Sequence, residues 1–385
     1  MAIETLRANI ERSVRRRALK TLFPKAGAAL LEKALTYQQA ILGDNAGYSL
    51  GMYNPATKTL FTDEKTAYKL PAAELHQYSA VFAIQSHSKR AMYIVEKNGK
   101  VSEFKGKTPL QFNPEKRNPN SGDPEGLLSL TAARNEAKGL NVIGELETGV
   151  VDLGAISPSF DGYAQLYRSG KDGFRYYPWL RLDSRPSVTG TLAELEGKTI
   201  EQFLHESGER LGRQLRKLHN AGYTLHNPWR EGAIGKEVVR KPIWYSSLHS
   251  ANVEIHGNLI DPEGMRTFEE AERLFWQRLA AEPTALTPKE RSSFESGKIS
   301  VGYYSRLCDI QRFFGGTHRL EKSMAGVLGR DGFVSLLRGF LAGYYDGYQA
   351  KEKIDLVIGG FNPPPTIKRI DLSRTNHILR QLEAA

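Results

Sequence analysis

The stretch that decides the fold covers residues 248–264 and reads LHSANVEIHGNLIDPEG. Within it, Asn252 precedes a short apolar strand, and Asp261 follows a turn and two further apolar residues. Magnesium prefers hard oxygen ligands, and phosphates and water commonly complete an octahedron that starts from one or two protein oxygens. Asn252 and Asp261 are therefore candidate magnesium ligands, and Glu263 is a further candidate that would act through water. The same letters also fit an ordinary hairpin in which the asparagine and the aspartate only form turns.

A lysine and a glutamate farther toward the N-terminus extend this pattern. Lys105 lies near the end of a predicted strand at residues 101–107, and Glu136 lies in a predicted helix at residues 127–140. Protein kinases position ATP with such a lysine, which pairs with a helix glutamate and faces the phosphates. Taken alone, either residue is more often a solvated surface charge. The ordered set of lysine, glutamate, asparagine and aspartate favours a site for ATP and Mg²⁺ over that alternative.

Hydrophobic periodicity divides the chain into a helical start, a strand-rich middle and a helical second half. Residues 1–42 have apolar positions at helical spacing, interrupted at Pro24 and Gly27, which predicts two helices. Residues 200–221 carry leucines at helical spacing, and helical patterns return after a loop-rich stretch at 223–262. Between these parts, β-branched, aromatic and alternating residues predict strands at 78–84, 91–97, 101–107, 149–156, 163–168 and 174–182.

This order of parts predicts an α+β protein with the two-lobed fold of the protein kinases. In that fold a small antiparallel-sheet lobe with one helix precedes a larger helical lobe. We expect an N-terminal helical extension at residues 1–60, the small lobe at 61–185 and the helical lobe at 186–385. The metal and nucleotide loop then falls at residues 246–264, within the helical lobe.

Three short motifs resemble the selenoprotein O family of pseudokinases. They are Lys105-Gly106 with the Thr-Pro that follows, the predicted helix that carries Glu136-Ala137, and the loop from Asn252 to Asp261. The resemblance implies a kinase fold and the transfer of AMP from ATP to protein hydroxyl groups. It also implies that the nucleotide is bound in the reverse sense to that of a kinase.

The second resemblance is to the aminoglycoside and methylthioribose kinases. It rests on Leu248-His249 with the following Asn252, and on the run Ile260-Asp261-Pro262-Glu263. This resemblance implies phosphoryl transfer to a small molecule. Together the two resemblances cover about residues 95–265 and leave out the N-terminal helices and the last part of the chain.

Both families use an aspartate that this chain lacks. The small-molecule kinases have a catalytic aspartate where this chain has Ser247, and the selenoprotein O family has an aspartate where it has Ala251. A positioned base accelerates a hydroxyl nucleophile by about a hundredfold or more, so its absence bears on mechanism. His249 is the candidate replacement because imidazole titrates near neutral pH, although it also fits a role in bracing the loop. A further alternative makes His226 the loop histidine and residues 228–245 an insertion.

The loop that would cover the phosphates is expected at residues 85–90. It lacks the glycines that let a backbone approach phosphate closely. Lys89 and Arg90 are candidate phosphate-binding residues through their charge. A surface hairpin with solvated basic residues fits the same stretch.

Composition sets broad limits on the kind of protein. The net charge of +10 suits a polyanionic partner, but the basic residues are spread along the chain apart from Arg15 to Arg17, so nucleic acid ranks below phosphorylated small molecules and proteins. One cysteine, Cys308, excludes an intrachain disulfide and suggests a core residue. No stretch approaches the roughly 20 apolar residues that span a bilayer, and residues 1–20 do not resemble a secretory signal. We therefore expect a cytoplasmic protein without a membrane partner.

The sequence thus predicts an atypical ATP-dependent transferase that moves AMP or phosphoryl from Mg-ATP to a hydroxyl group. In this interpretation Lys105 and Glu136 position the phosphates, and Asn252 and Asp261 hold the metal. The acceptor is a protein or a small molecule that the sequence does not identify. Two alternatives remain, a catalytically inactive pseudokinase that serves as a nucleotide-binding scaffold, and a small-molecule phosphotransferase.

Overall fold

The computed structural model of the 385-residue chain forms two compact units, residues 1–200 and residues 201–385, and each is described by itself. The structure describes residues 2–37, 41–42, 48–62, 67–75, 80–85, 90–106, 124, 126–171, 174–229, 231–234, 237–240, 243–324 and 331–345. The predicted loop at 85–90 lies largely outside these residues, and Lys89 with it.

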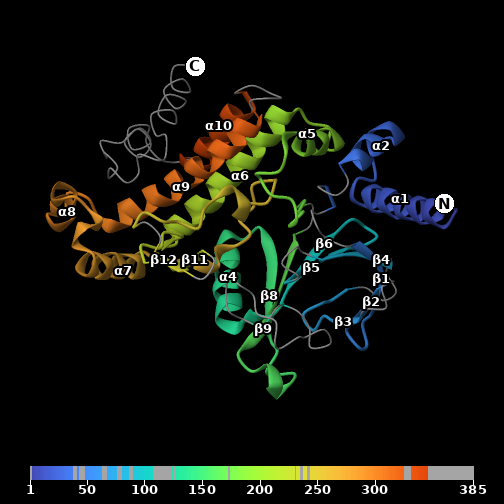
Figure 1. Ribbon diagram of the computed structural model, residues 1–385, viewed down its shortest axis with the longest axis horizontal. Helices are drawn as coiled ribbons and strands as arrows, with labels where there is room; N and C mark the ends of the chain where they lie inside the picture. The colour runs from blue at the N-terminus through green and yellow to red at the C-terminus, as the bar shows by residue number, and fades with distance from the viewer. Residues whose placement is uncertain are drawn as a thin grey trace. The chain divides into compact units, whose positions relative to one another are not determined.

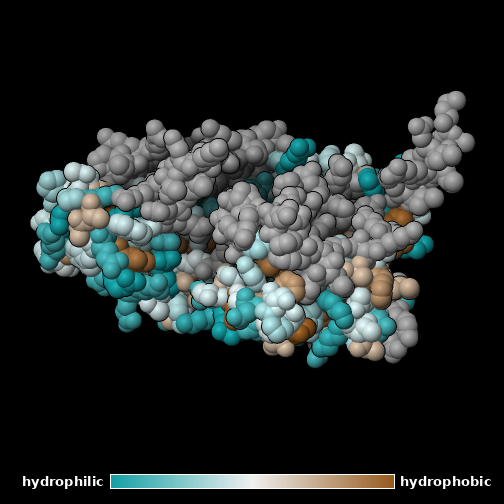
Figure 2. Space-filling model, turned by 60° about the horizontal axis from the view of Figure 1, so that its bottom comes forward, coloured by the Kyte–Doolittle hydropathy of each residue, from teal (hydrophilic) through white to brown (hydrophobic). Residues whose placement is uncertain are grey.

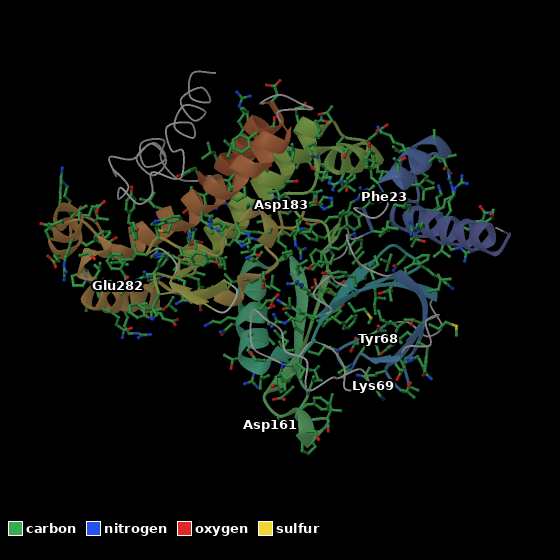
Figure 3. All side chains as sticks on the ribbon, viewed as in Figure 1. Phe23, Tyr68, Lys69, Asp161, Asp183 and Glu282 are labelled. Atoms are coloured by element: carbon green, nitrogen blue, oxygen red, sulfur yellow. The ribbon has the colours of Figure 1, made fainter. Side chains whose placement is uncertain are left out.

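The first unit begins with two helices, as the sequence predicts. They are α1 (Ala2–Leu22) and α2 (Ala28–Thr36), and the break between them contains Pro24 and Gly27. Arg12 of α1 forms an ion pair with Glu32 of α2 at 2.6 Å. Phe23, labelled in Figure 3, is buried after the end of α1 and lies 5.7 Å from the ring of Tyr177.

The first unit contains a nine-stranded antiparallel sheet (Figure 1). Its order is β3-β2-β1-β4-β5-β6-β9-β7, and β8 pairs with β9. The sheet starts at Tyr48, inside the stretch that the sequence analysis assigns to a helical extension. The strands are β1 (Tyr48–Asn54), β2 (Thr59–Thr62), β3 (Ala67–Lys69), β4 (Ala80–Gln85), β5 (Ala91–Val95), β6 (Val101–Lys105), β7 (Leu128–Ser129), β8 (Leu146–Asp152) and β9 (Tyr163–Gly170).

Every residue of the central strands β5 and β6 is buried, whereas β3 alternates between buried and more exposed positions, as the pleat of a strand with one covered face requires. On β3, Tyr68 is buried in a core cluster with Leu60 and Phe104, whereas the next residue, Lys69, is exposed (Figure 3). Residues 174–182, predicted as a strand, instead form turns and irregular backbone. Buried aromatic residues account for the strand-like pattern there, and Tyr177 packs against the rings of Phe23 and Trp179.

Helix α4 (Leu130–Ile143) packs on β8 and β9 and matches the helix predicted to carry Glu136. The Ser129 hydroxyl accepts a hydrogen bond from the Ala132 amide at 3.3 Å, which caps the first turn. Gly144 ends the helix with a φ of 76°, which glycine adopts without strain. Small residues such as Ala133 bring α4 close to the sheet.

The second unit is mainly helical. Its long helices are α6 (Ile200–Asn220), α7 (Phe268–Ala281), α9 (Val301–Met324) and α10 (Asp331–Tyr345), with α8 (Pro288–Glu295) shorter. The helix α5 (Pro186–Leu195) belongs to the first unit. Two small strand pairs join β10 (Tyr223–Thr224) to β13 (Arg266–Thr267) and β11 (Glu231–Ile234) to β12 (Glu237–Arg240).

Helices α6 and α10 lie side by side with their backbones in contact (Figure 1). A Cβ atom on Gly208 or Gly212 of α6 would lie 2.1 or 2.2 Å from a carbonyl oxygen of α10. A Cβ atom on Gly339 or Gly343 of α10 would lie 1.9 or 2.0 Å from a carbonyl oxygen of α6. Both helices therefore need glycine at a spacing of four residues, an arrangement that permits the closest helix packing.

The described surface is mostly polar. On the face shown in Figure 2, hydrophobic residues form small separate areas among hydrophilic ones. Of the large apolar side chains described, the exposed ones are Met52, Phe61 and Ile156. None of the helices in the described ranges has the length and apolar character to cross a membrane. The protein is thus an α+β protein with an antiparallel sheet and separate helices.

Candidate functional site

In the first unit, Lys105 and Glu136 form the ion pair that the sequence analysis expects. The Lys105 Nζ atom lies 2.7 Å from Glu136 Oε2, although the two residues are 31 positions apart. Lys105 sits at the end of β6, and Glu136 is fully buried on the face of α4 that packs on the sheet. The Lys105 side chain keeps 10% of its surface exposed.

Two residues that the sequence analysis missed extend this pair into a buried charge cluster, which we define as Glu103, Lys105, Glu136 and Arg168. Arg168 of β9 donates to Glu136 Oε1 at 2.5 Å through Nη1. It also donates to both carboxylate oxygens of Glu103, at 2.6 and 2.8 Å. The Tyr176 hydroxyl donates to Glu103 Oε2 at 2.9 Å.

The cluster contains equal numbers of positive and negative charges, which makes its burial tolerable. Burial by itself lowers the pKa of Arg168, but Glu103, Tyr176 and Glu136 outweigh it and raise that pKa well above its ordinary value. Arg168 is therefore a permanent cation that holds Glu136 from the side opposite Lys105. Lys105 has the most exposed side chain of the four, so it is the member best placed to reach a ligand.

The backbone around Lys105 depends on one glycine. Gly106 has a φ of 98°, and a Cβ atom there would lie 2.5 Å from the Ala164 carbonyl oxygen. The Gly106 amide donates to the Arg90 carbonyl at 2.8 Å, which places Arg90 next to the strand end that carries Lys105. Arg90 is half-buried, and its side chain has interactions beyond this backbone contact.

In the second unit, a tight hairpin joins Asn252 to the strand that leads to Asp261. Val253 pairs with Leu259, and the Ile260 amide donates to the Asn252 carbonyl at 3.1 Å. Asp261 is thus next to the residue that pairs with Asn252. The chain forms a hairpin here, which fits the metal-loop interpretation and the ordinary-hairpin alternative alike.

The buried side chain of Glu254 stabilises the turn of this hairpin. Its carboxylate is fully buried and lies 2.6 Å from His256 Nδ1 and 2.6 Å from Asn258 Nδ2. Gly257 has a φ of 86°, and a Cβ atom on it would lie 1.8 Å from the Ser207 carbonyl oxygen of α6. The turn therefore rests directly on the helix backbone.

Side chains of α6 fix the hairpin in place. Ser207 donates to the Ile255 carbonyl at 3.0 Å, and Arg210 donates to the His256 carbonyl at 2.9 Å. The Gln214 amide group donates to Asn258 Oδ1 and accepts from the Leu259 amide. These contacts restrict the hairpin, and with it the positions of the candidate metal ligands.

The Asn252 side chain is oriented by one hydrogen bond. Its Nδ2 donates to the Ser247 carbonyl at 2.9 Å, so its Oδ1 is turned away from that carbonyl. Asp261 and His249 are half-buried and take part in other interactions of the structure. The side chain of Glu263 lies outside the described residues. Within the described part of the chain, no three His, Cys, Asp or Glu side chains gather to hold a metal.

Asp309 of α9 connects the segment before the hairpin to the helices. Its Oδ2 accepts from His219 Nε2, the Thr224 hydroxyl and the Leu225 amide at 3.0, 2.7 and 3.0 Å. Its Oδ1 accepts from the Ser246 hydroxyl at 2.6 Å. Every member is buried, so this hub fixes the start and the end of the segment that leads to Ser247.

Residues 225–227 pair with residues 245–247 through the backbone. The Asn227 amide donates to the Tyr245 carbonyl, the Ser247 amide donates to the Leu225 carbonyl, and His226 pairs with Ser246. The first paired segment ends at residue 227 and the second begins at residue 245, and the β11–β12 pair lies between them in the sequence.

His226 is a buried neutral residue of this loop. Its Nε2 donates to the Ile243 carbonyl at 2.7 Å, and the Ser305 hydroxyl donates to its Nδ1 at 2.9 Å. Burial lowers the pKa of His226 to about 4, and burial likewise lowers the pKa of His219. His226 therefore braces the loop and is sealed away from any reacting group.

The donor set in the second unit fits magnesium. An amide oxygen and a carboxylate are hard ligands, and magnesium commonly takes only one or two protein oxygens when phosphates and water supply the rest. A lysine held by a glutamate suits contact with an anion such as a phosphate.

In the comparisons with known proteins, no protein-family model, no curated protein and no solved structure matches this chain.

Proposed function

We propose that this chain binds Mg-ATP and transfers AMP or phosphoryl from it to a hydroxyl group, on a protein-kinase-like two-lobed fold. The observation that carries the proposal is the buried Lys105–Glu136 ion pair, 2.7 Å long, which α4 and β6 form as the kinase-like interpretation requires. The amide of Asn252, oriented on the hairpin that leads to Asp261, supports the same proposal from the second unit.

The residues have separate tasks in this proposal. Lys105 binds a phosphate oxygen while Glu136 and Arg168 hold its position. Asn252 Oδ1 and a carboxylate oxygen of Asp261 hold the magnesium ion, which neutralises charge on the phosphates. Arg90 and Lys89 add positive charge near the phosphates, and Glu263 is a further ligand through water.

Neither family's carboxylate base is present at its usual position in this chain. Ser247 and Ala251 stand where the related families have aspartates. His226 cannot serve, because its two nitrogens are engaged inside the fold. His249 is half-buried beside the hairpin and is the proposed base.

A thermal-shift titration with ATP, with and without magnesium, tests the proposal. Ligand at a hundredfold excess over its dissociation constant adds about 2.7 kcal/mol to the free energy of unfolding. We expect a magnesium-dependent rise in Tm for the wild type that Asp261→Ala abolishes. Asp183→Ala is the matched control, because Asp183 is an exposed aspartate outside the hairpin (Figure 3). A well-folded wild type that shows no shift at millimolar ATP would exclude the proposal.

Group transfer is then followed with ATP labelled at the α- or the γ-phosphate. Label from the α-phosphate on protein indicates AMP transfer, and label from the γ-phosphate indicates phosphoryl transfer. The lack of both labels, with ATP binding intact, would favour the second candidate function, a nucleotide-binding scaffold. The observation that favours this candidate is Ser247, a residue without a carboxylate at the position of a catalytic base.

A further inference from the structure

Arg312 of α9 is a cation without a counter-ion in the described structure. Its guanidinium carbon lies 5.7 Å from the centroid of the Tyr245 ring, which covers one face of the group. Its Nε atom is buried and has no hydrogen-bond partner, and within the described residues no carboxylate pairs with the side chain. The ring stabilises the planar cation, but the buried Nε–H remains without a hydrogen-bond partner.

A second buried donor without a partner is two residues from Tyr245. Ser247 is 6% exposed, and its hydroxyl has no hydrogen-bond partner, although its backbone amide and carbonyl are both engaged. Leaving a buried hydroxyl unsatisfied costs about 1–3 kcal/mol, so such a group calls for an explanation.

The backbone places these two donors on one side of the chain. Tyr245, Ser246 and Ser247 pair with the segment 225–227 as extended backbone, in which alternate side chains point to the same face. Ser246 faces the other way and donates to Asp309. Ser247 therefore shares a face with Tyr245, on whose ring Arg312 rests.

This face continues to the candidate metal hairpin. The Ser247 carbonyl accepts from Asn252 Nδ2, so the unsatisfied hydroxyl belongs to the residue that orients a proposed metal ligand. Because Asp309 and Asn252 hold the segment on both sides of Ser247, the hydroxyl has a fixed position. A group bound there would lie next to the proposed transfer site.

We propose that Arg312 and Ser247 form an oxyanion subsite that binds a carboxylate or phosphate group of the acceptor. The inference rests on the proposed function, because only that function provides an acceptor. It restricts the acceptor to molecules that carry an oxyanion near the hydroxyl group that receives the transferred group. Arginine suits this role because its planar N–H edge matches two oxygens of a carboxylate or phosphate. The serine hydroxyl supplies a further donor.

A thermal-shift series with inorganic phosphate tests the subsite without nucleotide or magnesium. Potassium chloride keeps the ionic strength constant at about 0.15 M, so that general screening does not change. We expect phosphate to raise the Tm of the wild type, Arg312→Met to abolish the rise, and Ser247→Ala to reduce it. Arg312→Lys keeps the positive charge but loses the planar guanidinium group, so it should also reduce the rise in Tm.

Arg306→Met is the matched control. Arg306 lies on the same helix, and its guanidinium carbon is 5.3 Å from the centroid of the Phe268 ring. Its loss should leave the phosphate response unchanged. A wild type that does not respond to phosphate, or an Arg312→Met variant that responds as the wild type does, would overturn the subsite.

Titration of Mg-ATP into the same variants separates the acceptor from the nucleotide. If Arg312→Met loses the phosphate response but binds Mg-ATP like the wild type, the subsite belongs to the acceptor. If it weakens Mg-ATP and phosphate equally, the oxyanion is a phosphate of the nucleotide and the acceptor assignment is wrong. A wild type that responds to phosphate through Arg312 but does not bind Mg-ATP would remove the proposed function and support the anion site alone.

Discussion

At the scale of single residues, the molecule places several charged groups where water does not reach. In the first unit, Arg168 donates hydrogen bonds to both carboxylate oxygens of Glu103. Arg168 and Lys105 each donate to one carboxylate oxygen of Glu136. Without Arg168, a lysine that moved toward a ligand would leave Glu136 buried and unpaired. The cluster thus lets Lys105 contact an anion while Glu136 keeps a partner.

Removal of Arg168 should be strongly destabilising. Arg168→Met leaves Glu103 and Glu136 with a single cation, and breaking a buried ion pair in this way costs about 3–5 kcal/mol. The double variant Glu103→Gln with Arg168→Met restores the charge balance, so it should lose less stability than Arg168→Met alone. Urea unfolding of the three proteins measures the difference. If the double variant is less stable than Arg168→Met, the account of the cluster is wrong.

The neutral His226 should make stability depend on pH. Its pKa in the folded state is about 4, below the ordinary value of 6.5, so between these pH values the unfolded chain binds a proton that the folded chain does not. Stability is therefore fully present above pH 6.5 and falls as the pH drops toward 4. The full shift corresponds to about 3 kcal/mol.

Urea midpoints of the wild type and His226→Gln between pH 7 and pH 4 measure this effect. His226→Gln should be less stable at pH 7, and its stability should fall less steeply on acidification. Equal slopes of stability against pH in the two proteins would show that protonation of His226 does not cause the pH dependence. His219, whose pKa is also lowered, should leave a residual slope in the variant.

At the scale of elements, the close contact between α6 and α10 dominates the second unit. The glycines of both helices touch backbone, so an added methyl group has no space on either side. Because α6 also holds the hairpin that carries Asn252, a shift of this helix would displace a proposed metal ligand.

Gly212→Ala should destabilise the protein by about 1–3 kcal/mol or more, because the two backbones must separate. Gly302→Ala is the matched control. Gly302 lies in α9, and the nearest atom to its added Cβ is 3.9 Å away, an ordinary contact. The control should be neutral or slightly stabilising, since alanine favours a helix. Similar losses in thermal unfolding of both variants would contradict the packing argument.

Elements with strong local patterns were predictable from the sequence. The helices α1, α2 and α6 and the strands β4, β5 and β6 appear close to their predicted positions. Strands β1 to β3 were missed, since they are short or interrupted by glycine and by turns. Residues 174–182 were wrongly predicted as a strand, because buried aromatic residues imitate strand alternation.

The candidate site was predictable only in part, for a related reason. Lys105, Glu136, Asn252 and Asp261 belong to short motifs. The structure joins Lys105 to Glu136 in an ion pair and places Asn252 on the hairpin that leads to Asp261. Partners such as Arg168 and Arg312 come from distant parts of the chain and carry no local signal. Their roles follow from tertiary contacts, which the sequence alone does not specify.

At the scale of the whole molecule, each unit contributes a different part of the proposed chemistry. The first unit holds Lys105 in a buried charge cluster, and the second holds Asn252 and Asp261 on a braced hairpin. The central claim is that binding of Mg-ATP depends both on Lys105 and on Asp261. A change to either residue should therefore weaken binding strongly.

Calorimetric titration of Mg-ATP into the wild type, Lys105→Met and Asp261→Ala tests this claim most directly. Lys69→Met and Asp183→Ala are the controls, because both residues are exposed and lie outside the proposed site. We predict saturable, magnesium-dependent binding in the wild type and both controls, and a loss of at least about tenfold in affinity, or about 1.4 kcal/mol, in each site variant. Binding by folded Lys105→Met and Asp261→Ala with the affinity of the wild type would contradict the claim.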